Sequence, residues 1–381
     1  MVFLLNQTNI FEYLANLGYQ SDGITDRIEP VMAKNFNLLL SITEDSKLLV
    51  KQERHNREGK AVGEFLAESQ VHKLAEDFPA LSYWQRSISE LLHFDRDNSI
   101  LVFRYLNDYR DLADFYTKEN IFDDRIARKL GTILASFHRD TYHRAIYRLA
   151  LSKDRQQSET TIVKALIRNL EHLTPEIFGI VPEDGLKFYA LYQRYDSLGQ
   201  ALVELGDGVR ACCLTHNDLK LNNILLHNEW EQPGSQITRI IDWERAAWGD
   251  PAFDLGTLIA SYLQMWLGSL VVSKSLSIEE SLSLAIVPLD RIQPSIAALT
   301  QAYLQAFPDI LIDRPDFLVR VIQFAGLGLI QGIQANIDYQ KTLGNSGIAQ
   351  LQVAKSLLCR PDRSIQTVFG TEFSLQVSIT A

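Results

Sequence analysis

The fold of this chain is decided by the stretch Leu214–Gly249, which reads LTHNDLKLNNILLHNEWEQPGSQITRIIDWERAAWG. Its short apolar runs are separated by Asn, Gly and Pro, a pattern that predicts buried strands joined by turns. His216, Asp218 and Asn223 stand in the spacing H-x-D-x-x-x-x-N, and Asp242 follows a later apolar run. A hairpin of this kind is expected to bring Asn223 and Asp242 side by side, with Asp218 on the loop before them.

The residue types in this stretch suit the transfer of a phosphoryl group, which needs positioning and charge neutralisation more than covalent help from the protein. Asp218 can accept the proton of an attacking hydroxyl. Asn223 and Asp242 offer one neutral and one anionic oxygen ligand, which suits Mg²⁺. Lys220 can reach the migrating phosphoryl group as a point charge. The alternative is an ordinary loop with capping Asp and Asn residues, which the complete pattern disfavours.

Composition indicates an ordinary soluble globular protein. The 381 residues are enough for two lobes with separate cores, and 46% of them are hydrophobic while 22% are charged. The net charge of −10, with no run of Lys or Arg, argues against a nucleic-acid partner. An acidic surface would also suit a cationic acceptor, although many cytoplasmic proteins are equally acidic.

Neither export nor a membrane span is expected. The N-terminus has no basic region or small-residue cleavage site, and the most apolar stretch, residues 258–272, is interrupted by Ser, Gln and Gly. The chain has three cysteines, which make neither a disulfide framework nor a zinc site, and Cys212 and Cys213 are expected on a buried strand. We therefore expect a cytoplasmic protein, either a monomer or a homodimer.

Residues 1–106 are predicted to form a nucleotide-binding lobe. A leading helix at 8–18 is followed by three strands at 28–32, 38–42 and 47–52, and then by a helix at 57–78 and strands at 87–93 and 99–106. This gives a five-stranded antiparallel sheet with one inserted helix. Backbone groups from Phe103 through Tyr105 to Leu106 could pair with an adenine edge, although a plain edge strand fits these residues equally well.

Lys51 closes the third of these strands. A lone lysine in this place is most often a solvated strand end. The following helix carries Glu64 and Glu68, and either could hold Lys51 in an ion pair; the central position of Glu68 favours it. Such a pair keeps a lysine directed at nucleotide phosphates in phosphoryl-transfer sites.

Residues 107–360 are predicted to form a second, mostly helical lobe, and residues 361–381 a tail. Apolar residues at helical spacing predict helices at 124–140, 160–173, 186–205, 254–266, 288–307, 315–339 and 346–358. Asp254 stands in the first turn of one of them, where a carboxylate is stabilised by free amide groups. We expect it to hold the loop that carries Asp218 rather than to react.

In these motifs the sequence resembles the aminoglycoside phosphotransferase and choline kinase superfamily, over roughly residues 20–340. The family patterns HxDxxxxNIL, IDWE and GDPxxDL are matched here by HNDLKLNNIL, IDWE and GDPAFDL. The resemblance implies an α+β, two-lobed protein-kinase-like fold, with a five-stranded antiparallel sheet in the first lobe. It also implies transfer of the γ-phosphate of ATP, with Mg²⁺, to a hydroxyl of a small molecule such as an amino alcohol, a sugar or an aminoglycoside.

The resemblance also assigns roles to single residues. It implies that Asp218 is the catalytic base and that His216 supports the loop. It also implies that Asn223 and Asp242 are magnesium ligands and that Lys51 and Glu68 form a phosphate-orienting pair. Asn37 would be the asparagine of the phosphate-binding loop. Lys220 is less typical of antibiotic kinases, whereas protein kinases have a lysine there. His138 falls where the family often ends a helix with a leucine–histidine pair, and we expect it to support packing.

Several questions stay open on sequence alone. The loop at 32–37 has no glycine, which leaves the choice between ATP and GTP undecided. A non-catalytic, kinase-like binding or regulatory protein and a kinase acting on a protein or peptide side chain are the alternative functions. Acceptor-binding acids cannot be ranked among Glu279, Asp313, Asp316 and Asp338.

Overall fold

The computed structural model describes residues 3–19, 27–31, 35–56, 58–153, 161–171, 181–232, 237–271, 276, 278–371 and 373. The chain divides into two compact units. The first consists of Met1–Arg110, Ala145–Gln157 and Ile224–Ala247, and the second of Asp111–Arg144, Ser158–Asn223 and Trp248–Ala381. The first unit thus includes two segments, residues 145–157 and 224–247, that the sequence assigns to the second lobe at 107–360.

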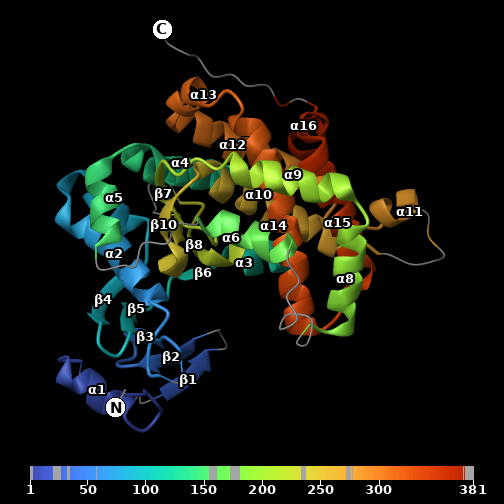
Figure 1. Ribbon diagram of the computed structural model, residues 1–381. Coiled ribbons are helices and arrows are strands. Elements are labelled where there is room, and N and C mark those ends of the chain that lie inside the picture. Colours follow the sequence, from blue (N-terminus) through green and yellow to red (C-terminus); the bar gives the residue numbers. More distant parts are fainter. Residues whose placement is uncertain are drawn as a thin grey trace. The chain divides into compact units, whose positions relative to one another are not determined.

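The first unit is built on the predicted five-stranded antiparallel sheet (Figure 1). Its strands run in the order β1-β2-β3-β5-β4. Their bounds are Arg27–Val31 for β1, Phe36–Ser41 for β2, Lys47–Gln52 for β3, Glu90–Asp95 for β4 and Ile100–Arg104 for β5. The structure therefore confirms this part of the predicted fold class.

Alternation along β5 gives the sheet two buried faces, because successive side chains point to opposite sides of a strand. Ile100 and Val102 belong to one core, which also contains the buried apolar residues of α1 (Ile10–Asn16). Leu101 and Phe103 pack on the other side against Phe65 of α2 (Glu64–Asp77). Lys51 stands opposite Leu101 in the register of β3 and β5, so its side chain lies on the face that α2 covers.

The sequence predicts that this helix begins at residue 57, but α2 begins at Glu64. Gly63 has φ of 92°, a left-handed conformation that glycine adopts readily and that ends the preceding loop. The carboxylate of Glu53 accepts hydrogen bonds from the backbone amides of Gly63 and Glu64 at 2.7 and 3.1 Å. This cap comes from a residue distant in sequence, which local patterning does not reveal.

The hairpin predicted from Leu214–Gly249 is present. Strands β8 (Ile224–His227) and β9 (Thr238–Ile240) are antiparallel, with Ile224 opposite Ile240, and β6 (Tyr109–Asp111) completes a three-stranded sheet. A second pair of strands, β7 (Cys213–Thr215) and β10 (Ala247–Gly249), flanks this hairpin in sequence. Asn223 and Asp242 belong to different units, so their adjacency stays a prediction.

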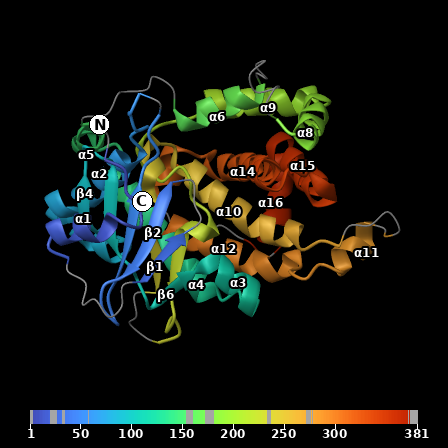
Figure 2. The ribbon, with the colours of Figure 1, turned by 90° about the horizontal axis from the view of Figure 1, so that it is seen from below.

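The second unit is a packed set of helices. Helix α4 packs on α12. Helix α14 packs on both α10 and α15, and these three helices are neighbours in Figure 2. Helices of this unit and its neighbouring short elements have these bounds: α3 Leu112–Glu119, α4 Asp124–Thr141, α6 Ile162–Glu171, α10 Pro251–Gly268, α11 Ile278–Ser283, α12 Leu289–Ala306, α13 Asp309–Asp313, α14 Phe317–Gln340, α15 Gly344–Cys359, and the 3₁₀ turn η2 Leu221–Asn223. In the first unit, α5 spans Ala145–Ser152, and 3₁₀ helices η1 and η3 span Pro79–Arg86 and Trp243–Arg245.

Two predictions for the helices are wrong. The single helix predicted at 186–205 is divided into α8 (Glu183–Gln193) and α9 (Asp196–Asp207), because Tyr195 between them has an extended backbone. Residues 361–369, predicted as part of a tail, form α16 (Pro361–Phe369), which packs on α14 and α12. Its proline at the first helical position suits a helix start, since that residue needs no backbone donor there.

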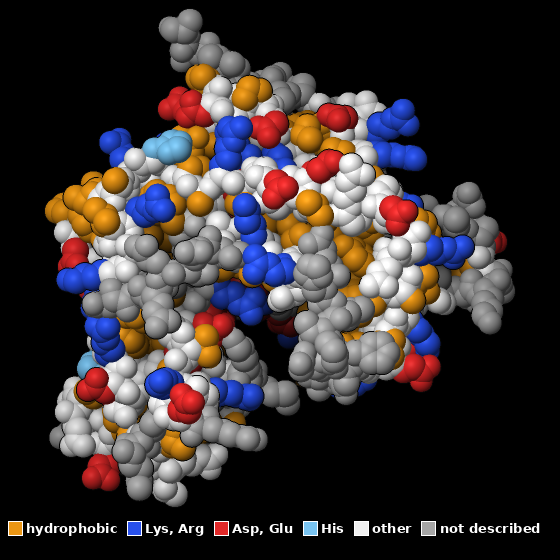
Figure 3. Space-filling model, viewed as in Figure 1, with side chains coloured by type: hydrophobic (Ala, Val, Ile, Leu, Met, Phe, Trp, Pro, Cys, Tyr) orange, Lys and Arg blue, Asp and Glu red, His pale blue; other side chains and the backbone are white. Residues whose placement is uncertain are grey.

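Helix α14 is long and apolar enough to pass for a membrane span, but 72% of its most apolar window is buried inside the protein. Such burial is typical of a core helix, and the cytoplasmic location stays a prediction. Cys212 and Cys213 are free and buried, as expected for apolar positions at β7. On the face drawn in Figure 3, basic and acidic side chains both occur across the surface.

Candidate active site

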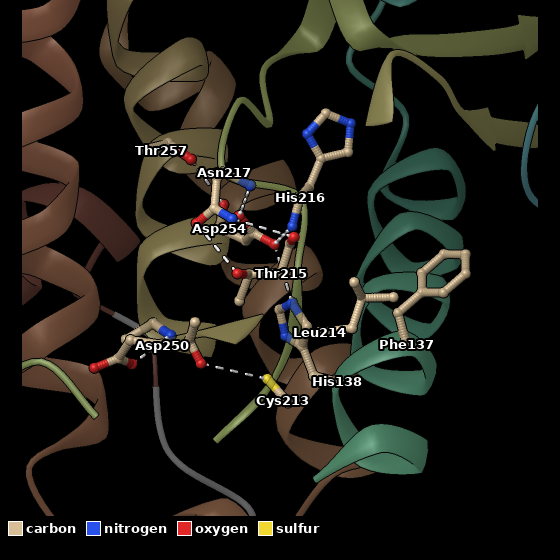
Figure 4. A network of polar contacts seen from close by, with 12 residues as sticks. Phe137, His138, Cys213, Leu214, Thr215, His216, Asn217, Asp250, Asp254 and Thr257 are labelled. Atoms are coloured by element: carbon tan, nitrogen blue, oxygen red, sulfur yellow. Dashed lines mark hydrogen bonds and ion pairs between the residues drawn. The ribbon is translucent and has the colours of Figure 1, made fainter. Parts of the chain in front are cut away.

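The loop that follows β7 is held by a carboxylate from helix α10. Asp254 accepts hydrogen bonds from the backbone amides of His216 and Asn217, at 2.6 and 2.8 Å (Figure 4). Asn217 has φ of 62°, in the left-handed region that asparagine tolerates better than most residues. The two hydrogen bonds fix this uncommon backbone turn immediately before Asp218.

Asp254 is itself held by a buried polar chain. His138 of α4 contacts the Asp254 carboxylate through Nε2 at 3.2 Å, and its Nδ1 lies 2.8 Å from the hydroxyl of Tyr303 on α12. All three side chains are buried, and a buried charge is costly unless it has partners. Asp254 thus holds the loop as predicted, while His138 adds hydrogen bonds to its predicted packing role.

Asp250 is the side chain that caps α10. Its carboxylate accepts from the backbone amides of Ala252 and Arg210, and Arg314 donates to it at 2.7 Å in a buried ion pair. The preceding Gly249 is required by space, because a Cβ atom there would lie 2.2 Å from Oγ1 of Thr215. The residues Gly249, Asp250 and Pro251 therefore connect the start of α10 with the strand that leads into the loop.

Asp218, Lys220 and Asn223 come together on the loop. Lys220 Nζ lies 3.1 Å from Oδ2 of Asp218, and their side chains are 46% and 26% exposed. Asn223 Nδ2 donates to the backbone carbonyl of Asp218 at 2.8 Å and approaches its Oδ2 at 3.4 Å. Both amide hydrogens of Asn223 can thus face Asp218, which turns the amide oxygen Oδ1 away from it.

His216 supports Asp218 from within the core. Its side chain is fully buried, and its ring Nδ1 accepts a hydrogen bond from the backbone amide of Asp218 at 3.3 Å. This contact positions the backbone of Asp218, in agreement with the loop-support role that the family resemblance implies.

In the first unit, Lys51 is surrounded by three carboxylates. It forms an ion pair with Asp242, and Glu68 and Glu244 add to the negative charge around it. Burial lowers the pKa of Lys51, but the three acids outweigh burial and raise it above its usual value. Lys51 is therefore a buried ammonium held among acids, not a solvated strand end.

Glu68 of α2 is the helix carboxylate that faces Lys51. Burial raises the pKa of Glu68 from 4.5 to about 7, against the opposing effect of Lys51, while Asp242 and Glu244 raise it further. Glu64 is only partly buried, at the first position of α2. Of the two glutamates that the sequence leaves in competition, Glu68 is the one whose charge acts on Lys51, but the ion pair of Lys51 among the described residues is with Asp242.

Asp242 follows β9 with φ of 62°, in the left-handed region that Asn217 also adopts. Such conformations cost energy and cluster at functional sites. Glu244, two residues later, accepts a hydrogen bond from Asn35 at 3.2 Å. Glu244 was missed as a site candidate, although it stands in the quoted IDWE motif and could have been found there.

Asn37 and Phe103 lie on the same face as Lys51. Asn37 stands opposite Lys51 in the register of β2 and β3, and its amide oxygen is buried without a hydrogen bond from the described residues. The Phe103 ring centre lies 5.4 Å from Lys51 Nζ. Residues 32–34 of the predicted phosphate-binding loop lie outside the described residues.

Pairing of an adenine edge with backbone groups of Phe103 to Leu106 stays a prediction, in which the amide of Tyr105 is not free to take part. The Tyr105 amide donates to the Lys47 carbonyl at 2.9 Å, so the sheet already uses it. The sequence shows β-propensity at this position but not where the partner strand ends. The Tyr105 side chain is 38% exposed.

The five-stranded sheet with its buried lysine and the mostly helical second unit with its Asp254-anchored loop are the parts of a kinase-like fold. The family model described as "Phosphotransferase enzyme family" matches residues 37–274. Because this match covers more than half of the chain, the protein belongs to that family.

Solved structures share the fold at low sequence identity. A choline/ethanolamine kinase family protein from Mesorhizobium loti is 15% identical with a TM-score of 0.50, over 96% of this chain and 99% of that one. The streptomycin-ATP-APH(2")-IIa ternary complex is also 15% identical, with a TM-score of 0.50 over 93% and 99%. No curated protein sequence matches the chain. The structural likeness establishes the kinase-like fold.

The raised pKa of Glu68 predicts a pH-dependent effect of Glu68→Gln. Between pH 4.5 and about 7 the folded protein holds a proton that the unfolded chain releases, so this group lowers the free energy of unfolding as pH rises. The stability of Glu68→Gln relative to wild type should therefore increase from about pH 5 to about pH 8. Urea denaturation at both pH values measures this, with Glu64→Gln as the control. A pH-independent difference would contradict the prediction.

Asp254→Asn should loosen the loop. An amide side chain carries one acceptor oxygen in place of two, so it cannot accept from the amides of both His216 and Asn217 in the wild-type geometry. Losing one such hydrogen bond costs about 1–3 kcal/mol. Hydrogen–deuterium exchange should be faster at residues 216 and 217 than in wild type, while Asp316→Asn, at an exposed position, leaves it unchanged. Unaltered exchange in Asp254→Asn would show that this carboxylate does not hold the loop.

Proposed function

We propose that this protein transfers the γ-phosphoryl group of ATP to a hydroxyl group of a small molecule, with Asp218 as the catalytic base. The observation that carries the proposal is the partly exposed Asp218 carboxylate on a loop whose backbone is locked by Asp254, in a member of a phosphotransferase family. Asp218 takes the hydroxyl proton, the hydroxyl oxygen bonds to the γ-phosphorus, and the bond from this phosphorus to the β–γ bridging oxygen breaks to release ADP.

Lys51 is the proposed phosphate-binding residue of the first unit. Its pKa is raised by neighbouring acids, so it stays charged throughout the physiological range. Glu68 orients it, and Asn37 presents a buried amide group on the same face. A similar structure is described as a complex with ATP, which supports ATP as the donor, with GTP as the alternative to test.

Asn223 and Asp242 are the proposed magnesium ligands. The donor set fits, because Asn223 directs its amide hydrogens to Asp218 and keeps an oxygen for the metal, and Asp242 supplies a carboxylate that is 36% exposed. Mg²⁺ prefers such oxygen ligands together with water and phosphate oxygens. When bound, it would neutralise phosphate charge.

A non-catalytic binding protein is the main alternative. Against it, the chain retains every residue type that the reaction needs, at Lys51, Glu68, Asp218, Asn223 and Asp242. A protein or peptide acceptor is a second alternative, and the assay below includes a peptide for that reason.

Asp218→Asn should slow acceptor-dependent ADP release by about 100-fold or more, since general base catalysis typically contributes that much. The assay measures magnesium-dependent ADP release with amino alcohols, sugars, aminoglycosides and a serine-containing peptide. Asp114→Asn is the matched control, because Asp114 is an exposed carboxylate paired with a lysine in the same unit. Equal rates for wild type and Asp218→Asn with every acceptor would contradict the assignment.

A further inference from the structure

The ion pair between Asp218 and Lys220 sets the charge that an acceptor meets at the proposed base. The two groups lie 3.1 Å apart on one loop and are both partly exposed. Asp218 alone would present a negative charge that attracts an ammonium group. With Lys220 beside it, the net charge of the pair is zero.

Three other carboxylates of the helical unit already have hydrogen-bond donors or a cation as partners. Asp254 accepts from the two loop amides and contacts His138, and Asp250 is paired with Arg314. Asp111 caps α3 through the amide of Asp114 and also bonds with the side chain of Asn222. Within the described ranges, no cluster of three or more His, Cys, Asp or Glu side chains could surround a metal cation.

The pair also offers a specific hydrogen-bonding pattern. Lys220 has three N–H donors, and one direction is used by Asp218, while the carboxylate has several lone pairs and no donor when ionised. Donors and acceptors therefore stand side by side. A compound with two neighbouring hydroxyls matches this pattern, because one hydroxyl donates to Asp218 while the oxygen of the next accepts from Lys220.

We propose that the acceptor is an uncharged polyhydroxy compound, of the sugar or polyol class, and that Lys220 determines this specificity. The inference rests on the proposed phosphotransferase function and narrows its acceptor. Amino alcohols and aminoglycosides carry ammonium groups close to their hydroxyls, and a neutral pair lacks the net negative charge that would attract these groups. Anionic acceptors are disfavoured by the carboxylate and by the phosphates of the nucleotide.

The experiment compares acceptors in pairs that differ in charge but little in shape. The pairs are choline with 3,3-dimethylbutanol, ethanolamine with ethylene glycol, and glucosamine with glucose, and kcat/KM comes from ADP release with the full-length protein, ATP and magnesium. Wild type should prefer the uncharged member of each pair. Lys220→Gln should shift this ratio towards the cation by about tenfold, the size expected for one unit charge at a partly solvated site.

Two further variants keep the result interpretable. Lys220→Arg retains the charge and should retain the wild-type ratio, whereas Lys118→Gln removes the lysine of the Asp114 ion pair and should not change it. A general loss of rate cancels within each pair. Should Lys220→Gln turn over too slowly, the ratio of dissociation constants for glucosamine and glucose, measured by competition with calorimetry, replaces the kinetic ratio.

The outcomes separate this inference from the proposed function. ADP release with none of the acceptors, and none with a wider panel, would contradict the phosphotransferase proposal. Acceptor-dependent release with a preference for the cationic members, or a ratio that Lys220→Gln leaves unchanged, would overturn the role of Lys220 while the phosphotransferase proposal stands.

Discussion

The candidate catalytic loop depends on one buried carboxylate, that of Asp254. A charge inside a protein is tolerated only when donors surround it, and here the donors are the backbone amides of His216 and Asn217 together with the ring of His138. Because these two amides belong to the loop, the hydrogen bonds that stabilise the buried carboxylate also fix the backbone conformation of the loop. The first turn of α10 adds free amide groups that favour the negative charge. The position of Asp218 is therefore a consequence of the core of the helical unit.

In the first unit the buried charge is positive, because it is carried by a lysine. Lys51 lies among Glu68, Asp242 and Glu244, which keep it protonated despite burial. These acids come from α2 and from the segment after β9, which the chain reaches by way of the hairpin. The acids outnumber the lysine when all are ionised, and the raised pKa of Glu68 lessens this excess of negative charge. The arrangement favours a site that gains positive charge when it is occupied, as the proposed magnesium site does.

Sequence patterning could predict the elements whose causes are local. The strands of the sheet and the β8–β9 hairpin follow from alternating or apolar runs between turn residues. Asp218 and Asn223 stand out by their motif spacing, whereas Lys51 is a candidate only through the family resemblance. What it could not predict has tertiary causes. The start of α2 depends on a carboxylate at Glu53, and the amide of Tyr105 is taken by a neighbouring strand. Tyr303 joins the network from α12 without any motif, whereas Glu244 was visible in the IDWE motif and was overlooked.

The two proposals are that this protein transfers a phosphoryl group to a hydroxyl and that the acceptor carries no positive charge. The most direct test uses no assumption about the acceptor. The protein is incubated with ATP, magnesium and an extract of cellular metabolites, and mass spectrometry then searches for compounds that have gained one phosphate. We predict that an uncharged sugar or polyol is phosphorylated by wild type and not by Asp218→Asn. A wild-type protein that phosphorylates no metabolite, or one whose product forms equally with Asp218→Asn, would contradict this prediction.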